Sequence, residues 1–285
     1  MRNHYIPRSY LKGFTEAEGS PYIFMYEKRA KKSIRTNILN VAQETGFYSD
    51  EIEKFLADKI ETPGKPVLLA IRNHESIGAE ARQILVNYMI VMMIRVPHSK
   101  EDRIKWLQQN IDPYLNDLEK HLSELYESRP DKRTILGGRI QELATLRAER
   151  KPIPEKMWYT SMSPEHYPQV SWAMKNMTWQ FLTTKEDAFL TCDNPLFFFR
   201  ELGLGRTNSE LYFPISTRVA LWGTWRSKSL EGYKKATDSF IHEANRRIVS
   251  VASRYIYFSK GRDDLVRFVN RTNHRVKYLI TRQAG

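Results

Sequence analysis

The sequence predicts an α+β fold in one domain, residues 1–285, with one mixed or antiparallel sheet built from N- and C-terminal strands. Three observations predict it. β-prone runs lie on both sides of residues 27–32, similar runs recur after residue 178, and the segment between shows the 3.6-residue periodicity of helices. Since 41% of the residues are hydrophobic and 27% charged, the composition is that of a globular chain rather than a disordered one.

The first forty residues predict a short helix followed by a β-hairpin. Pro7 stands where a helix over 8–14 begins, a position at which its missing N–H costs nothing. Residues 21–26 and 33–39 are β-prone and flank a basic tip of Lys28, Arg29, Lys31 and Lys32. The tip has two interpretations: protection of a sheet edge by charge, or contact with phosphate.

Helices follow. Ser49 is a suitable N-cap for a helix that we expect to end at Pro63-Gly64, with a second helix starting at Pro66. The segment 78–95 is apolar nearly all round, which predicts the core helix, and it ends before Pro97. Residues 98–150 predict a helical insertion: two polar-faced helices joined at 129–131 in a long antiparallel hairpin.

A proline-rich, linker-like stretch at 151–168 precedes the C-terminal part. There we expect helices at 169–177, 238–254 and 263–272, the middle one strongly amphipathic. Strands are expected at 178–184, 188–192, 196–199, 211–213, 218–225 and 255–258.

The charge balance favours a polyanionic partner such as nucleic acid. The net charge is +12 with a pI of about 9.6, and the excess sits at the two ends: +5 over residues 1–40 and +9 over 151–285. The densest stretch, 246–282, holds ten basic residues. An ordinary solvated surface remains the alternative interpretation.

Several classes of protein are excluded by sequence patterns. The single cysteine, Cys192, cannot form an intramolecular disulfide, no secretory leader is recognisable, and the most apolar run, 84–96, is shorter than the roughly 20 residues that cross a bilayer. We therefore expect a cytoplasmic protein without a membrane partner. Dinucleotide-binding, P-loop, zinc and nucleophile-elbow motifs are missing from the sequence.

Three residues are candidates for catalysis. His4, beside a helix start, has the pKa range for proton transfer, or it caps the helix. Arg95 ends the apolar helix and predicts a pairing with a carboxylate or ligand phosphate, or a capping role. Asp193, before Asn194-Pro195 and between apolar runs, predicts a catalytic carboxylate, a ligand for a divalent cation or an Asx-turn. The sequence identifies no cofactor, and a divalent cation at Asp193 is the one candidate.

Six further residues are candidates for substrate binding. Asn245 lies mid-helix beside an apolar face, where a buried amide needs partners, and a structural hydrogen bond is its other interpretation. The remaining five are chosen because they adjoin a catalytic candidate or lie in the basic stretch: Tyr5, Arg8, Asn194, Arg246 and Arg247.

The strings that carry these residues resemble the family called domain of unknown function 4238. They are His4-Tyr5-x-Pro7-x-x-Tyr10-Leu11-x-x-Phe14, Asn40-Val41-Ala42-Gln43-Glu44, Arg95-x-Pro97, Leu190 to Pro195, Phe213 to Ser216, and Asn245 with Ala252-x-x-Tyr255. The resemblance spans nearly the whole chain and implies a cytosolic bacterial protein, of a kind also carried by mobile elements. The family usually has a small hydroxylated residue where Cys192 stands. The resemblance points to His4, Pro7, Arg95, Asp193, Asn194 and Asn245 without implying an activity.

Two hypotheses follow. The first is a nucleic-acid-directed enzyme, a nuclease or other phosphodiesterase of the defence or toxin type, in which Arg95 neutralises phosphate charge, His4 transfers a proton and Asp193 orients His4 or carries a metal ion. The alternative is a non-catalytic module that binds nucleic acid or a protein, with the helical hairpin as a contact surface. An enzyme acting on a nucleotide or another small anion is the third possibility.

Overall fold

The computed structural model describes residues 2–149, 158–225, 231–261 and 263–271. It is an α+β structure whose chain divides into two compact units, one made of residues 1–96 and 163–285 and the other of residues 97–162. Within the described ranges, no helix combines the length and apolar character needed to span a membrane.

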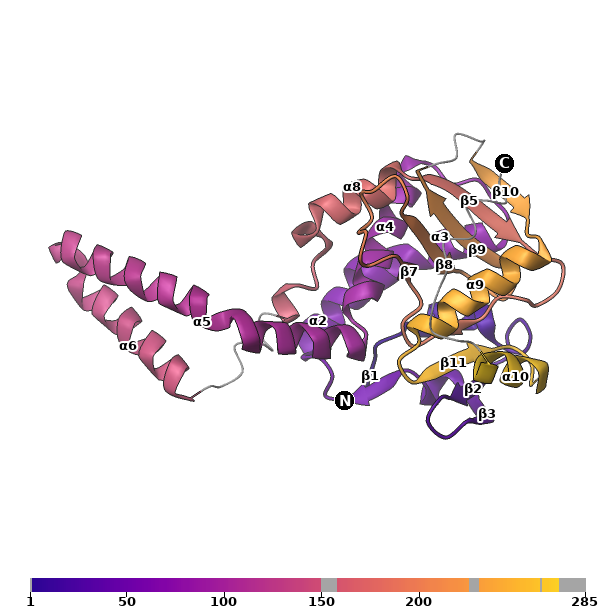
Figure 1. Ribbon diagram of the computed structural model, residues 1–285, viewed down its shortest axis with the longest axis horizontal. Helices are drawn as coiled ribbons and strands as arrows, with labels where there is room; N and C mark the ends of the chain where they lie inside the picture. The colour runs from indigo at the N-terminus through magenta and orange to yellow at the C-terminus, as the bar shows by residue number, and fades with distance from the viewer. Residues whose placement is uncertain (1, 150–157, 226–230, 262, 272–285) are drawn as a thin grey trace. The chain divides into compact units, whose positions relative to one another are not determined.

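The N-terminal part of the larger unit contains four strands and four α-helices among its described residues (Figure 1). The strands are β1 (Arg2–His4), β2 (Tyr22–Glu27), β3 (Lys32–Asn37) and β4 (Gln43–Thr45). The helices are α1 (Arg8–Leu11), α2 (Asp50–Phe55), α3 (Thr62–Arg72) and α4 (Ala79–Ile94), with 3-10 turns at Lys12–Phe14 and Ile38–Asn40.

The C-terminal part of this unit contributes most of the strands. The helices are α8 (Pro168–Asn176), α9 (Asp238–Val251) and α10 (Asp263–Arg271), preceded by a 3-10 turn at Pro164–His166. The strands are β5 (Thr178–Thr183), β6 (Thr191–Cys192), β7 (Phe197–Phe198), β8 (Glu210–Pro214), β9 (Val219–Thr224), β10 (Gly232–Lys235) and β11 (Tyr255–Phe258).

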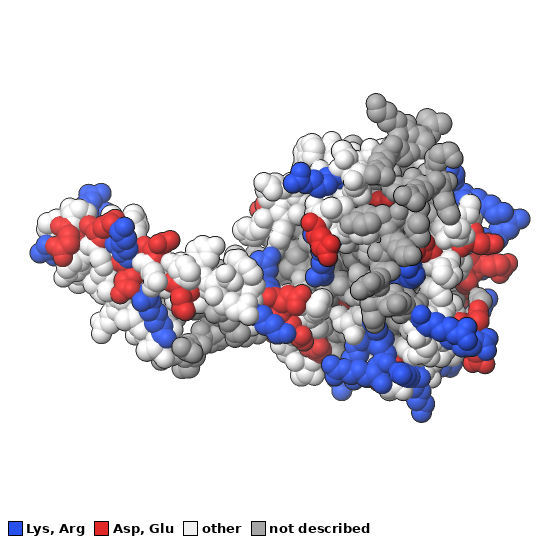
Figure 2. All heavy atoms as spheres, in the orientation of Figure 1, with Lys and Arg blue, Asp and Glu red and all other residues white. Residues whose placement is uncertain are grey.

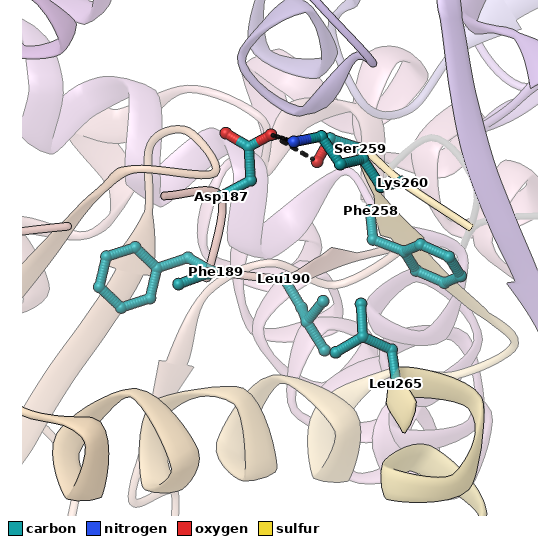
Figure 3. A pocket seen from close by; sticks show the side chains of 8 residues that line it. Asp187, Phe189, Leu190, Phe258, Ser259, Lys260 and Leu265 are labelled. Carbon is teal, nitrogen blue, oxygen red and sulfur yellow. Dashed lines mark hydrogen bonds and ion pairs between the residues drawn. The ribbon is translucent and has the colours of Figure 1, made fainter. Parts of the chain in front are cut away.

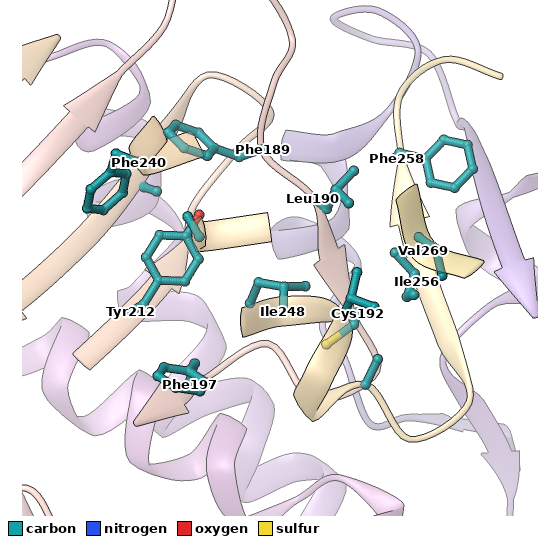
Figure 4. Close-up of a cluster of buried hydrophobic side chains, with 14 of the residues drawn as sticks. Phe189, Leu190, Cys192, Phe197, Tyr212, Phe240, Ile248, Ile256, Phe258 and Val269 are labelled. Atoms are coloured by element: carbon teal, nitrogen blue, oxygen red, sulfur yellow. The ribbon is translucent and has the colours of Figure 1, made fainter. Parts of the chain in front are cut away.

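These strands form three sheets rather than the single sheet predicted. The order β3-β2-β11-β6 confirms that the N-terminal hairpin joins a C-terminal strand, while β10-β5-β9-β8-β7 is a separate mixed sheet and β1-β4 a two-stranded one. The physical reason is α9. Its apolar residues, among them Phe240, Ala244 and Ile248, belong to one buried cluster that also includes residues of both larger sheets. Figure 4 shows this cluster. Each of the two sheets therefore has an apolar face of its own that packs against α9.

The helical segment 50–72 is also unlike the prediction of a break at Pro63-Gly64. A π-helical turn, Leu56–Glu61, links α2 to α3 without interruption, and Pro63 occupies the first turn of α3. The preceding turn is π-helical, with the N–H of Thr62 bonded to the oxygen of Ala57, so the i→i−4 hydrogen-bond pattern is already interrupted next to Pro63. Gly64 lies against the ring of Tyr88 on α4, where a Cβ would stand 2.5 Å from Cδ2.

The predicted core helix and helical hairpin are confirmed. In α4, eight residues from Leu85 to Ile94 are buried. In the smaller unit, α5 (Pro97–Ser128), a 3-10 turn at Pro130–Lys132 and α6 (Arg133–Glu149) form an antiparallel pair in which Arg147 reaches back to Glu119 at 2.9 Å. Leu107 and Leu143 are buried there.

Candidate nucleic-acid interface

Arg95 is bound by groups of the protein itself. Its side chain is 1% exposed, and its guanidinium donates to Glu61 Oε1 at 2.7 Å and to the Tyr48 hydroxyl at 3.1 Å. A third bond goes to the backbone oxygen of His4, not to the imidazole. Although burial favours the neutral form, Tyr48 and Glu61 hold the pKa of Arg95 above its usual range. Arg95 therefore fastens β1 to α4 as a fixed cation.

Glu61 was not singled out from the sequence. It belongs to the π-helical turn, and an extra residue in a helical turn rotates the side chains after it away from the face that a 3.6-residue period assigns. The sequence did signal that a carboxylate partner was needed, because Arg95 stands at the end of an apolar helix and a buried guanidinium requires a counter-charge. Which carboxylate supplies the charge is decided by the helix geometry.

His4 lies close to Arg95 through its backbone, and its ring occupies a different environment. The imidazole is half-buried, and its Nε2 is a buried atom without a hydrogen-bond partner among the described residues. Burial, followed by the positive charge of Arg8, lowers the pKa of His4. Arg8 itself is exposed at the first position of α1. The ring is therefore neutral at pH 7 and capable of accepting a proton.

Asp193 organises the turn that joins α9 to β11. One carboxylate oxygen accepts the N–H of Ser253 at 2.8 Å, and the other accepts the N–H groups of Arg254 at 2.6 Å and Tyr255 at 3.0 Å. Burial raises the pKa of Asp193, and the three N–H donors oppose that rise. Both oxygens are thus engaged by backbone.

Asn194 completes the same turn by donating its amide to Val251 O at 3.3 Å. Across the described ranges, His, Cys, Asp and Glu side chains nowhere gather in a group of three that could hold a metal ion. Three of the roughly four acceptor sites of the Asp193 carboxylate are thus taken by backbone N–H groups.

Tyr5, a candidate for substrate binding, lies near Asp193. Its ring is 4% exposed and packs 5.8 Å from that of Phe47. Burial and the negative charge of Asp193 raise the pKa of the Tyr5 hydroxyl far above its ordinary value. Tyr5 is therefore a neutral, buried hydrogen-bonding group.

Asn245 binds a stretch of backbone. Its Oδ1 accepts the N–H of Leu190 at 2.9 Å and its Nδ2 donates to Ala188 O at 2.8 Å. The amide therefore acts as a strand neighbour for residues 188–190, which precede the short strand β6. This is the structural hydrogen bonding that a buried amide requires.

The basic stretch 246–282 divides into arginines on α9 that the protein itself binds and residues that are exposed, namely Arg254, Lys260, Arg267 and Arg271. Arg247 is fully buried and pairs with Glu210 at 2.7 Å and Glu243 at 3.3 Å, while Arg246 pairs with Glu243. Lys260 is paired as well, with Asp187 at 3.4 Å. Arg246 and Arg247 do not contribute to an exposed patch because carboxylates from β8 and α9 neutralise them. Four members of the stretch lie outside the described residues: Arg262, Arg275, Lys277 and Arg282.

The nine predicted residues thus fall into separate groups. His4, Arg8 and Arg95 meet around β1, Tyr5 lies near Asp193 and Asn194 at the α9–β11 turn, and Arg246 and Arg247 share Glu243. Asn245 stands apart on the backbone of residues 188–190.

A small cavity of about 20 Å³ lies beside Asp187 (Figure 3). Asp187 accepts hydrogen bonds from Thr217 and Ser259 and pairs with Arg218 and Lys260. With a volume near that of one water, the cavity leaves no room for a ligand. The cluster ties three loops together, and these partners hold the pKa of Asp187 below its usual value against the effect of burial.

The tip of the β2–β3 hairpin carries cations of another kind. Arg29, Lys31 and Lys32 are exposed, and Lys31 takes a positive φ of 52° in the turn. Lys28 is different, because its ammonium donates to Ala252 O at 2.7 Å and so caps the C-terminal end of α9.

The carboxylates near this tip are already paired. Glu27 binds Arg254 at 2.8 Å, and Glu16 forms two bonds with Arg35, whose guanidinium also stacks 3.8 Å from the ring centre of Tyr22. Figure 2 shows Lys and Arg side chains gathered over the part of the surface where β2 and β3 lie. The tip is therefore a local concentration of positive charge that its own carboxylates do not neutralise.

Comparison with known proteins adds a family and no activity. No curated protein matches the chain, and no solved structure matches it either. One family model, described as Protein of unknown function (DUF4238), matches residues 2–262. Because the match covers nearly the whole sequence, the chain belongs to the DUF4238 family.

Proposed function

We propose that this protein binds nucleic acid without a catalytic role for Arg95 or Asp193, and that the β2–β3 tip contacts the phosphate backbone. One observation carries the proposal: Arg29, Lys31 and Lys32 are exposed together on one turn, and the neighbouring carboxylates Glu16 and Glu27 are held by other arginines. Phosphate contacts by such side chains supply most of sequence-independent binding.

The internal bonding of Arg95 and Asp193 supports the binding role over the enzymatic one. A catalytic group needs at least one polar atom that reaches the substrate, whereas all three nitrogens of Arg95 are bound by Glu61, Tyr48 and the backbone of His4, and both oxygens of Asp193 by backbone N–H groups. Withdrawing either group from these partners would leave a buried charge unpaired.

The test is the salt dependence of binding to a 20-base-pair DNA duplex and to a matching RNA duplex, measured by fluorescence anisotropy. We expect Arg29→Ala, Lys31→Ala and Lys32→Ala together to weaken binding and to reduce the slope of log K against log salt by about 3, since each lost phosphate contact lowers it by about 1. The control replaces three exposed lysines on other elements, Lys54, Lys59 and Lys65, and so changes the net charge equally. Equal losses in both triple variants contradict a specific role for the tip.

A phosphodiesterase activity is the second candidate, favoured by one observation. The Nε2 of His4 is a buried atom without a partner in the described structure, on a ring whose lowered pKa keeps it neutral. Such an imidazole suits a general base. The measurement is cleavage of labelled RNA and DNA with Mg²⁺ or Mn²⁺ by the wild type, His4→Ala and Asp193→Ala. Intact substrates, with variants altered only in thermal stability, would remove this candidate.

A further inference from the structure

A groove on the larger unit lies between α8 and the loop that follows β7. Its volume is about 640 Å³, within the range of ligand-binding clefts. The lining is mostly apolar and comes from two walls. One wall is Pro168, Gln169, Val170, Trp172 and Ala173, and the other is Gly203, Leu204 and Gly205.

Trp172 forms an exposed aromatic platform in this groove. Its side chain is 60% exposed, which is unusual for the largest apolar side chain. On one side it stacks against Trp225, with ring centres 5.7 Å apart and planes inclined by 27°. Trp225 is fixed in turn, because its Nε1 donates to Leu204 O at 2.7 Å. Trp172 is therefore supported on one face by a ring that is itself hydrogen-bonded to the opposite wall.

The opposite wall is low and consists of backbone. Gly203 has a positive φ of 65°, a conformation that favours glycine, and neither Gly203 nor Gly205 has an atom within 4 Å of the position a Cβ would take. Open space above two glycines, facing an exposed indole, fits a flat ring better than a branched side chain.

Charged residues are close in sequence to the residues that line the groove, and none of the lining residues is charged. Lys175 lies three residues after Trp172 on α8, hence on the same side of the helix, and Arg206 follows Gly205 on the other wall; both are exposed. Glu165 and Glu201 are exposed near the same two segments. A ligand that joins a planar ring to an anionic group matches this surrounding.

We propose that this groove binds an unpaired base of single-stranded nucleic acid, with the base stacked on Trp172 and adjoining phosphates near Lys175 and Arg206. The choice of nucleic acid as the ligand rests on the proposed function. The groove itself is a separate site, because α8 and the β2–β3 tip lie at opposite ends of the larger unit in Figure 1. Base-on-aromatic stacking of this kind tolerates any sequence.

The experiment measures binding of the full chain to a fluorescein-labelled dT12 strand and to a 12-base-pair duplex. We expect Trp172→Ala to weaken dT12 binding by about 5- to 100-fold, the effect of losing one stacked base, and to change duplex binding by less than about 2-fold. Trp172→Phe keeps an aromatic face and should retain most of the affinity. Trp106→Ala is the matched control, since Trp106 is an exposed tryptophan of the smaller unit.

Cross-linking locates the contact directly. With a single 5-iodouracil in the strand, ultraviolet light should attach it to the peptide that contains Trp172. Equal dT12 affinities of Trp172→Ala and Trp106→Ala, or a cross-link elsewhere only, would overturn the base-binding groove while leaving the tip untouched. The base-binding groove is also overturned, and the tip retained, if the Arg29, Lys31 and Lys32 triple variant loses duplex binding while Trp172→Ala changes the binding of neither probe. A wild type that binds neither probe overturns both proposals. An apolar peptide that binds the groove when dT12 does not overturns the base-binding groove alone.

Discussion

Two sets of cations in the larger unit have opposite environments. Arg95 and Arg247 are buried and paired with carboxylates, whereas Arg29, Lys31 and Lys32 are exposed on a hairpin turn. In the first set, the charge holds segments together that are far apart in sequence: Arg95 joins α4 to β1, and Arg247 joins α9 to β8. The net charge of the sequence therefore indicates a surface for a polyanionic partner only when the buried, paired cations are left out of the count.

Arg72 extends the first set in a different way. Its guanidinium donates to three backbone oxygens, those of Ser9, Tyr10 and Ile215, instead of to a carboxylate. Burial lowers the pKa of Arg72. Together with Arg95, it binds the backbone of the N-terminal segment, so the sequence string that begins at His4 is a structural centre of the fold.

The largest expected effect comes from breaking a buried pair. Arg95→Met leaves Glu61 unpaired and removes the bonds to Tyr48 and His4, so we expect the free energy of unfolding to fall by about 3–5 kcal/mol. Urea titration followed by circular dichroism measures it. The double variant with Glu61→Gln should recover part of the loss; a single variant as stable as the wild type would show that the pair does not hold β1 in place.

The contact of α3 with α4 should show the next largest effect. Gly64→Ala puts a methyl group 2.5 Å from Tyr88 Cδ2, and overpacking of this kind costs about 1–3 kcal/mol. The midpoint of urea unfolding gives the value. Gly78→Ala is the control, because nothing lies within 4 Å of the added Cβ there. Similar midpoints for the two variants would contradict the close approach of the helices.

A smaller effect should depend on pH through His4. Because burial lowers the pKa of His4 in the folded state, the unfolded chain binds its proton first as the pH falls below about 6.5. The contribution of neutral His4 to stability is therefore present at pH 7.5 and is lost as the pH falls toward the folded pKa. We expect the difference in unfolding free energy between wild type and His4→Asn to shift against the wild type from pH 7.5 to 5.5. A difference that stays constant across this range would mean that the ring is not shielded.

The smallest effect is expected at the hairpin tip. Replacing Arg29, Lys31 and Lys32 by alanine should change the unfolding free energy by no more than about 0.5 kcal/mol per site, because these side chains are exposed. The same triple variant is expected to lose nucleic-acid affinity. A loss of affinity without a loss of stability distinguishes the tip from Arg95. A large loss of stability would place the tip among the structural cations.

Much of the fold was predictable because it rests on local patterns. The helical hairpin, the core helix α4, the amphipathic helix α9 and the pairing of the N-terminal hairpin with a C-terminal strand all follow from periodicity and turn residues. The strands β1, β4 and β10 were missed. They are three or four residues long and carry no alternation of their own, so they exist only where a partner strand lies beside them.

The candidate residues were recognisable as unusual, and their partners were not. The sequence marks Arg95, Asp193 and Asn245 because polar groups within apolar runs need partners. It does not show that the partners are Glu61 on a π-helical turn, the N–H groups of residues 253–255, or the backbone of residues 188–190. Those choices depend on distances between segments separated by 34 to 62 positions.

The sequence by itself determined the α+β class, the helical insertion, the family and the positive charge, since each depends on composition or on neighbours along the chain. The tertiary structure decided the division into three sheets, because α9 packs between two of them, and it decided which cations are consumed internally. A buried charge must find a counter-charge or a set of dipoles, and only the packed chain determines which side chains are close enough to supply them.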